Sequence, residues 1–258
     1  CILDAGNWEG DTLTEDLDLS YRAQLKHWKF HYLVDVVAPA ELPITINAIR
    51  SQQFRWNKGG AENFRKFIAQ VITAKGHPIW TKINAFFHLI NSSMFLNILL
   101  VSILSVPLIY IKSAYPELSL AYDISTLFII STIIFFTCYW FIHKYIYGGG
   151  LRSFLQYINC FISFYTLVMG FSIHNSIAVL EGYVGKKSSF VRTPKFNKSK
   201  MKDNKYAIKK ISFYSFIEIA LALYFLFGMY ASFNIVAKVD FGLFLFHFFL
   251  FIGFSSIS

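Results

Sequence analysis

Five long apolar stretches dominate the sequence, at residues 84–111, 124–147, 155–180, 211–236 and 239–258. An α-helix needs roughly 20 apolar residues to cross the hydrocarbon core of a bilayer, so each stretch is a candidate crossing. The composition agrees, because 55% of the residues are hydrophobic and only 15% are charged, too few to cover the surface of a soluble domain. The sequence therefore predicts a multi-pass integral membrane protein.

The net charge of +9 is concentrated in one loop. Residues 186–210 are rich in Lys and Arg, and Asp203 is the only acid among them. The positive-inside rule predicts that such a loop is cytoplasmic. A site for a phosphate-bearing ligand is a second interpretation, and both place the loop in the cytoplasm. We do not expect nucleic acid as a partner, since the loop lies between membrane segments.

This loop constrains the topology. If residues 1–80 are cytoplasmic and the first three apolar stretches each cross once, the basic loop ends on the outer side, against the rule. In one solution, the second half of stretch 155–180, which contains polar residues such as His174 and Asn175, lies at the interface or re-enters. In the other, stretch 84–111 is split around Asn91–Ser93. The sequence leaves both open.

Residues 1–80 are more polar and predict a soluble or peripheral region. Thr14 is a candidate helix N-cap, because it precedes several acids that favour a helix N-terminus. The alternation at residues 30–37 predicts a strand. A helix is expected over about 44–58, with Gly59–Gly60 as its stop, and a second amphipathic helix over about 61–74.

Three short motifs could carry chemistry. Thr14–Asp16 places a carboxylate at a rigid helix start, where it could take a proton from a hydroxyl, although a plain helix N-terminus explains it equally. Gln52, Arg55 and Trp56 would share one helix face that suits a sugar diphosphate, or form an ordinary interfacial helix. The motif FVRTPKF at 190–196 offers a hydroxyl and two cations, or is a charged linker.

Taken together, these motifs show a family resemblance. The stretch from Leu3 to about Lys66 resembles the end of the catalytic domain of cellulose-synthase-like family 2 glycosyltransferases, closest to the glucomannan and mannan synthase branch and its bacterial relatives. It is carried by DAGNWEGDTLTEDLDLSYRAQLKHWKF, by the ELP of Glu41–Pro43 and by QQFRW. FVRTPKF resembles the gating loop of processive members, FxVTxK in cellulose synthases, with Arg192 as a departure.

The resemblance implies roles for the site residues. Asp16, with its neighbour Glu15, would be catalytic, and Asp16 would be the general base that activates the acceptor hydroxyl. The donor diphosphate and the terminal acceptor sugar would be held by Gln52, Arg55 and Trp56. The nucleotide would be contacted on loop insertion by Phe190, Thr193 and Lys195.

It also implies a fold and an organisation. The fold class would be the α/β tail of a GT-A type nucleotide-diphospho-sugar transferase domain, followed by an α-helical bundle of roughly four to six membrane helices. Residues 1–43 would end the catalytic domain, and 44–80 would form interfacial amphipathic helices carrying QQFRW. Residues 81–181 would be transmembrane and interfacial helices, 182–210 the basic cytoplasmic gating loop, and 211–258 a transmembrane hairpin.

The implied activity is a processive, inverting transfer of hexose from UDP- or GDP-hexose to a growing β-glycan, which is then extruded across the bilayer. The family's divalent cation, Mg or Mn, would be bound by upstream residues that this sequence lacks, since we expect it to be a C-terminal fragment. No metal ligand is predicted within it.

Two other classes of function stay open. One is a non-processive transferase acting on a lipid or small acceptor, and the other is a multi-helix transporter without chemistry. A bacterial inner membrane is the preferred location, because the chain is rich in Phe, Ile, Lys and Asn, with a plant-type Golgi enzyme as the alternative.

Overall fold

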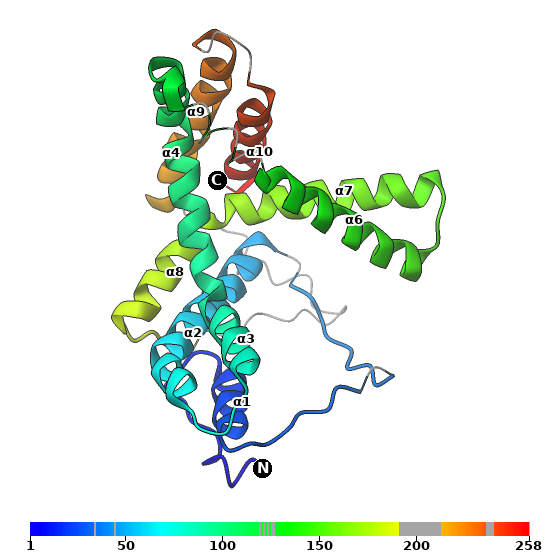
Figure 1. Cartoon of the computed structure of the whole chain (residues 1–258), viewed down its shortest axis with the longest axis vertical. Coiled ribbons are helices and arrows are strands. Elements are labelled where there is room, and N and C mark those ends of the chain that lie inside the picture. Colours follow the sequence, from blue (N-terminus) through cyan, green and yellow to red (C-terminus); the bar gives the residue numbers. More distant parts are fainter. Residues whose placement is uncertain are drawn as a thin grey trace, which may run out of the picture. The chain divides into compact units, whose positions relative to one another are not determined.

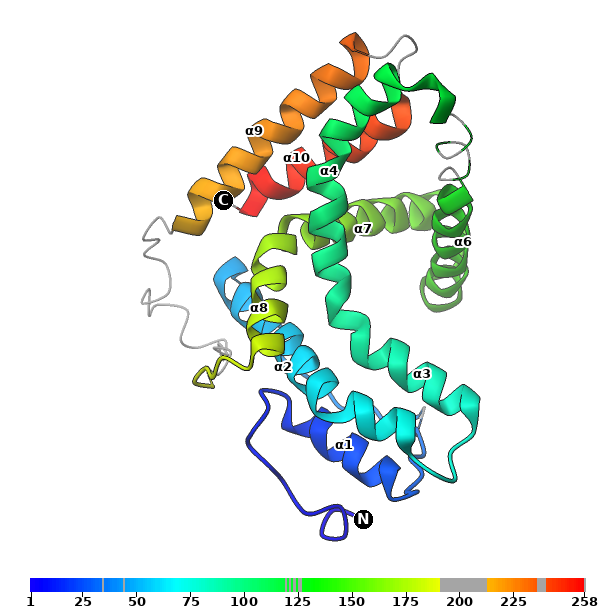
Figure 2. The same ribbon diagram turned by 60° about the vertical axis from the view of Figure 1, so that its left-hand side comes forward.

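Helices form nearly all of the regular structure in the computed structural model. It describes residues 1–33, 35–43, 45–118, 120, 122, 124, 127–190, 213–235 and 240–257. The chain divides into two compact units (Figures 1 and 2). The first unit comprises Cys1–Ile98 with Ser172–Lys210, and the second comprises Leu99–Phe171 with Ile211–Ser258.

The first unit contains α1 (Glu15–Leu25), α2 (Ile46–Thr73), α3 (Ile79–Ile90), the 3₁₀ turn η1 (Asn91–Ser93), the start of α4 (Met94–Ala114), and α8 (Ser172–Val184). The second unit contains the rest of α4, the 3₁₀ turn η2 (Pro116–Leu118), α6 (Leu127–Tyr147), α7 (Leu151–Gly170), α9 (Phe213–Asn234) and α10 (Phe241–Ile257).

Helix α2 is the longest element of the first unit, with 28 residues and no interruption. Its N-terminus is capped by Thr45, whose hydroxyl accepts a hydrogen bond from the Ala48 N–H at 3.3 Å. The expected stop at Gly59–Gly60 is therefore wrong, and residues 44–58 and 61–74 do not form two helices. A Cβ on Gly59 would lie 2.9 Å from the backbone nitrogen of Thr14, and one on Gly60 would meet the Ser92 hydroxyl. The glycines serve close packing and not helix termination.

Two further contacts complete the first unit. A cluster of buried side chains joins α1, α2 and α3; its members are Tyr21, Phe67, Val71 and Leu89. On another side, α8 runs along α2 (Figure 2). A Cβ on Gly182 would lie 2.7 Å from the Lys58 carbonyl oxygen, so glycine is what lets the two backbones approach.

The strand predicted over residues 30–37 is wrong, because its described residues form no strand. Phe30, Tyr32, Val36 and Val37 are exposed. A strand is stable only when neighbours pair its backbone groups, and the described residues contain no strand at all. The α/β part of the predicted fold class is accordingly not confirmed, whereas the helical part is.

In the second unit, α10 packs against both α9 and α7. A Cβ on Gly253 would lie 2.6 Å from the Thr166 carbonyl oxygen, so α7 and α10 cross at close range. The Ser105 hydroxyl and His247 Nε2 lie 2.8 Å apart, both buried. This contact satisfies the Ser105 hydroxyl and Nε2 of His247 within the unit.

Among the described residues, two helical segments are long and apolar enough to cross a membrane, Ile79–Ala114 and Tyr214–Asn234. A third results if α7 and α8 count as one broken span. Of the two irregularities that the topology suggested, the first is present as a break with a 52° bend between α7 and α8, whereas η1 is one 3₁₀ turn within the continuous segment Ile79–Ala114. The side of the basic loop stays a prediction, because residues 191–212 lie outside the described part.

Replacing Gly59 with Ala tests the packing of α1 on α2. The new methyl group would meet the Thr14 backbone, which cannot swing away as a side chain can, and we expect a loss of about 1–3 kcal/mol in the free energy of unfolding. The melting midpoint of the detergent-solubilised full-length protein should fall by several degrees. Gly10→Ala is the control, since nothing lies within 4 Å of its Cβ position. Equal midpoints for both variants would contradict the packing role.

Candidate functional site

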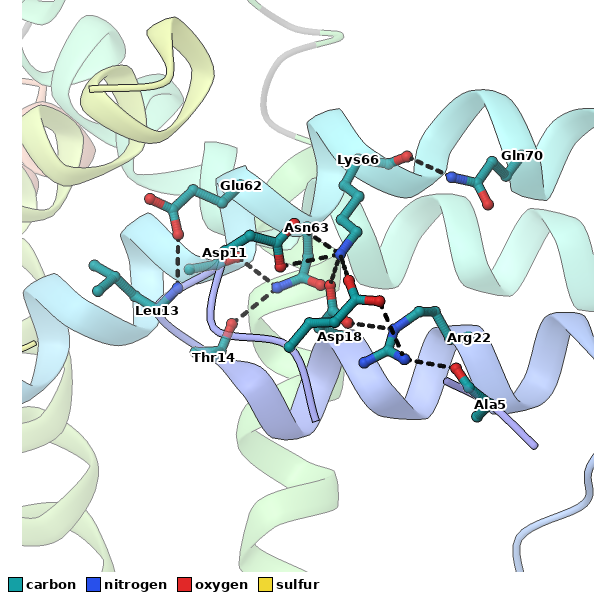
Figure 3. A network of polar contacts seen from close by, with 12 residues as sticks. Ala5, Asp11, Leu13, Thr14, Asp18, Arg22, Glu62, Asn63, Lys66 and Gln70 are labelled. Atoms are coloured by element: carbon teal, nitrogen blue, oxygen red, sulfur yellow. Dashed lines mark hydrogen bonds and ion pairs between the residues drawn. The ribbon is translucent and has the colours of Figure 1, made fainter. Parts of the chain in front are cut away.

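A charged network fixes the start of α1 against α2 (Figure 3). The Lys66 ammonium lies 2.5 Å from the Asp18 carboxylate and 2.8 Å from those of Asp11 and Glu9. Asp18 is fully buried, and its second oxygen accepts a 2.6 Å hydrogen bond from Arg22. One lysine of α2 is thereby tied both to α1 and to the loop before it.

Two hydrogen bonds between α2 and the loop before α1 extend this attachment (Figure 3). The Leu13 N–H donates to Glu62 at 2.7 Å, and the Asn63 amide donates to the Thr14 hydroxyl at 2.9 Å. Thr14 is the N-cap residue of α1, as predicted, but its side chain makes no capping bond to the helix. Its hydroxyl serves the contact with α2 instead.

The network shifts the pKa of its members. Burial lowers the pKa of Lys66, but hydrogen bonds to Asp11, Asp18 and Glu9 outweigh this and raise it overall. Burial raises the pKa of Asp11, yet its bonds to Lys66 lower it overall. The stability contributed by Lys66 is thus lost at alkaline pH, and that of Asp11 is lost at acidic pH. Both are present around neutrality.

Glu9, Asp11 and Asp18 are close enough together to suggest a metal site. The Lys66 ammonium, however, makes ion pairs with all three carboxylates. A divalent cation would have to displace this lysine and would leave its charge without partners. The residues present do not fit a metal ion, and no catalytic step is assigned to one.

The predicted acids lie at the exposed start of α1. Asp16 and Glu15 are both exposed, and an Asp16 oxygen accepts a 2.8 Å hydrogen bond from the Leu17 N–H. Glu15 lines a cavity of about 440 Å³ together with Trp8 and Phe190. Asp16 is not among the lining residues. Its position leaves the carboxylate accessible to an incoming hydroxyl.

A second cavity, of about 430 Å³, follows one face of α2. It is lined by Leu13, Asn47, Arg50, Ser51, Phe54, Arg55, His174, Ser188 and Ser189. Leu13 and Ser188 also line the first cavity, so the two adjoin. In this combined hollow, the second cavity has two guanidinium groups, those of Arg50 and Arg55, and several hydroxyls among its lining residues, groups that suit phosphate and sugar oxygens. The carboxylates of Glu9 and Glu15, by contrast, line the first cavity.

The structure brings two of the predicted motifs together at this hollow. The Arg55 guanidinium carbon lies 4.7 Å from the centre of the Phe190 ring, within the range of a cation–π contact. Gln52 is half-buried and Trp56 is 49% exposed, and neither lines the cavity. Thr193 and Lys195 lie outside the described residues. The roles given to all these residues stay predictions.

Several residues of the hollow had no role predicted from the sequence. Arg50 and Phe54 were passed over, although they are one helical turn apart on the face that also carries Arg55. His174 lies in the stretch predicted to lie at the interface or to re-enter; it packs against α2, where it lines the cavity and lies 3.2 Å from the Arg50 carbonyl oxygen. A helical plot of α2 could have revealed the first two, whereas His174 comes from a distant segment.

Comparisons with known proteins support the resemblance. Glucomannan 4-beta-mannosyltransferase 1 of Oryza sativa subsp. japonica is 45% identical over 87 residues, 34% of this chain and 17% of the relative. Probable glucomannan 4-beta-mannosyltransferase 9 of the same plant is 48% identical over 80 residues, 31% of this chain and 15% of the relative. Glucomannan 4-beta-mannosyltransferase 2 of Arabidopsis thaliana is 44% identical over 82 residues, 32% of this chain and 15% of the relative.

The chain thus spans less than a fifth of the length of these relatives. No protein-family model matches it, and no solved structure gives a significant match. Over about a third of its length, the predicted resemblance to the glucomannan and mannan synthase branch is confirmed.

Replacing Lys66 with Met tests the charged network. The change keeps the length of the side chain but leaves the buried Asp18 with Arg22 alone, and it removes the cation between three carboxylates. We expect a loss of about 2 kcal/mol at neutral pH, less than for a fully enclosed pair because Lys66 is partly exposed. The deficit relative to wild type should stay nearly constant down to about pH 4 and shrink below it, because the lowered pKa of Asp11 keeps its carboxylate charged until the pH falls below its ordinary value of 3.8.

The measurement is the melting midpoint of the full-length protein as a function of pH. Lys26→Met is the matched control, because Lys26 forms an exposed ion pair with Asp4, where little stability is at stake. A deficit that does not shrink as the pH falls below about 4 would show that Lys66 acts through packing and not through charge.

Proposed function

From the homology of this chain with glucomannan 4-beta-mannosyltransferases, we propose that it is part of a membrane-bound inverting glycosyltransferase that builds a polysaccharide from a nucleotide sugar. The observation that carries the proposal is the hollow on α2, where Arg55 of QQFRW meets Phe190 of FVRTPKF. The two residues are 135 positions apart (190 − 55), they contact each other, and they line two adjoining cavities, which a shared ligand explains better than two unrelated membrane anchors do.

The reaction is a displacement at the anomeric carbon of the donor sugar. The acceptor hydroxyl oxygen forms the new bond, and the bond from the anomeric carbon to the diphosphate oxygen breaks with its electron pair. Asp16 takes the proton of the acceptor hydroxyl. Asp16 lies in the first turn of α1 with its side chain exposed, so its carboxylate can accept that proton.

Arg55 offsets the charge of the departing diphosphate. A guanidinium group binds phosphate oxygens through paired N–H donors and stays charged throughout. Its contact with the Phe190 ring fixes its direction from one side. Gln52 and Trp56 would contact the sugars, as the family resemblance implies, and Thr193 and Lys195 would contact the nucleotide.

The finer features of the activity are part of the same proposal. The names of the relatives favour a mannose donor, UDP- or GDP-linked, and a β-glycan acceptor. Processive extension, extrusion across the bilayer and a Mg or Mn ion held by residues outside the printed sequence follow from the family resemblance. The apolar helices place the protein in a membrane. The relatives named above are plant proteins, so the preferred bacterial inner membrane has no support.

Of the two alternatives, the non-processive transferase retains the same site and differs in the length of its product. A transporter without chemistry has nothing in its favour, because the relatives are named as transferases.

The proposal is tested with the full-length protein in membrane vesicles. Labelled GDP-mannose, UDP-glucose and UDP-N-acetylglucosamine are supplied separately with magnesium or manganese, and the product is sized. We expect a high-molecular-weight polymer from one donor. Asp16→Asn should reduce its formation at least 100-fold, since a general base contributes about 10²–10⁴-fold to a rate. Arg55→Leu should also reduce it strongly.

Asp35→Asn is the matched control, because Asp35 is an exposed carboxylate between α1 and α2. A short or lipid-linked product would favour the non-processive alternative. Full activity of Asp16→Asn would disprove the assignment of the base, and absence of transfer from every donor would disprove the function.

A further inference from the structure

Lys58 follows QQFRW on α2 and is completely buried. Its ammonium donates a 3.0 Å hydrogen bond to Glu181 of α8 and a second hydrogen bond to the hydroxyl of Ser188. Among the described residues, Glu181 is the only carboxylate that forms an ion pair with Lys58. A buried cation of this kind is stable only while those partners stay in place.

Glu181 lies at the end of α8, where the chain turns back towards α2. Gly185 has a φ of +81°, and the N–H groups of Gly185 and Lys186 both donate to the Glu181 carbonyl oxygen at 3.0 Å. Such a left-handed glycine ends a helix and reverses the chain. The turn delivers Ser188 to the Lys58 ammonium.

Two residues after Ser188, Phe190 reaches the Arg55 guanidinium. The chain from Lys186 to Phe190 is exposed and has no regular secondary structure. Two of its contacts with α2 are the Lys58–Ser188 hydrogen bond and the Arg55–Phe190 stacking, three positions apart on the helix. Positions three apart on a helix lie on neighbouring parts of one face.

We propose that Lys58 is a positioning residue, which fastens the segment 186–190 to α2 through Glu181 and Ser188 and so sets Phe190 against Arg55 at the hollow. The proposal rests on the proposed function, because the hollow is taken as the donor site. Lys58 itself does not line the cavity and would not contact the donor. It would instead fix where the segment that leads into FVRTPKF begins.

The charges predict an asymmetry between the partners. Glu181 also forms an exposed ion pair with Lys186 at 2.5 Å, so it keeps a cation when Lys58 is removed. Among the described residues Lys58 has no second ion pair, although the charge of Glu62 also acts on it, so removal of Glu181 leaves a buried ammonium without its ion-pair partner. Glu181→Gln should therefore release the segment more than Lys58→Met does, and the double variant should be no worse than Glu181→Gln alone.

The first measurement needs no activity. Trypsin cuts after Lys187, and cleavage of that bond requires the segment to leave α2. In vesicles of the full-length protein, we expect Glu181→Gln to speed this cleavage about tenfold, Lys58→Met less, and Ser188→Ala several-fold, as followed by mass spectrometry. Lys186→Met is the matched control, since it removes the exposed cation from the same carboxylate and should leave the rate within about twofold.

The second measurement separates positioning from folding. For Ser188→Ala, which removes one of the two hydrogen bonds of the buried Lys58 ammonium but leaves its ion pair with Glu181, we expect the KM for the nucleotide sugar to rise several-fold with kcat nearly unchanged and only a small fall in the melting midpoint. Should Lys58→Met fail to fold, this variant still decides the question. Unchanged cleavage in Glu181→Gln and Ser188→Ala would overturn the proposal, and so would faster cleavage without any change in KM.

The two proposals fail separately. If wild-type vesicles transfer no sugar from any donor, the proposed function is wrong, while the order of the cleavage rates still shows whether Lys58 holds the segment. If transfer occurs and the cleavage order is absent, the function stands and Lys58 is part of the packing only.

Discussion

The close contact of three segments with one uninterrupted helix is the constraint on which the first unit depends. The N-terminal loop, η1 and α8 each reach α2 at a glycine or directly beside one, at Gly59, Gly60 and Gly182 respectively. Gly59 and Gly182 carry no Cβ. The backbone of Thr14 can therefore approach Gly59, and the backbone of Lys58 can approach Gly182, more closely than any other residue would allow. The hollow on α2 exists because these segments are held so near.

Ion pairs then determine which way of packing these segments against α2 is stable. Two lysines of α2 point in different directions, with Lys66 towards α1 and its preceding loop, and Lys58 towards α8. Each is satisfied by carboxylates from segments distant in sequence, so each ion pair also specifies a long-range contact. Burial makes an unpaired partner costly, and the pairs therefore act as much against wrong arrangements as in favour of the native one.

The sequence predicted those parts of the molecule that depend on local pattern. The acids around Asp16 mark the start of a helix, the described parts of the apolar stretches are helical, and the polar break near Ser172 is a bend between two helices. Prediction from the sequence failed where contacts between segments distant in the chain determine the structure. Gly59 reads as a stop when only its own helix is considered, and becomes a packing position once Thr14 is opposite. Alternation at residues 30–37 indicates a strand, but no local signal shows whether another strand is present to pair with it. Lys58 looks like one more surface charge until Glu181 is placed beside it.

Lys66 is shared among three carboxylates, and this predicts which of the three positions can tolerate substitution during evolution. Loss of the charge at either rim position, Glu9 or Asp11, still leaves the ammonium with two anionic neighbours, so one such change is buffered by the other. Asp18 has no such freedom, because it is the member that is wholly enclosed and that also receives Arg22. Substitutions among descendants of this chain should therefore accumulate at the two rim positions, one at a time, while the enclosed aspartate stays fixed.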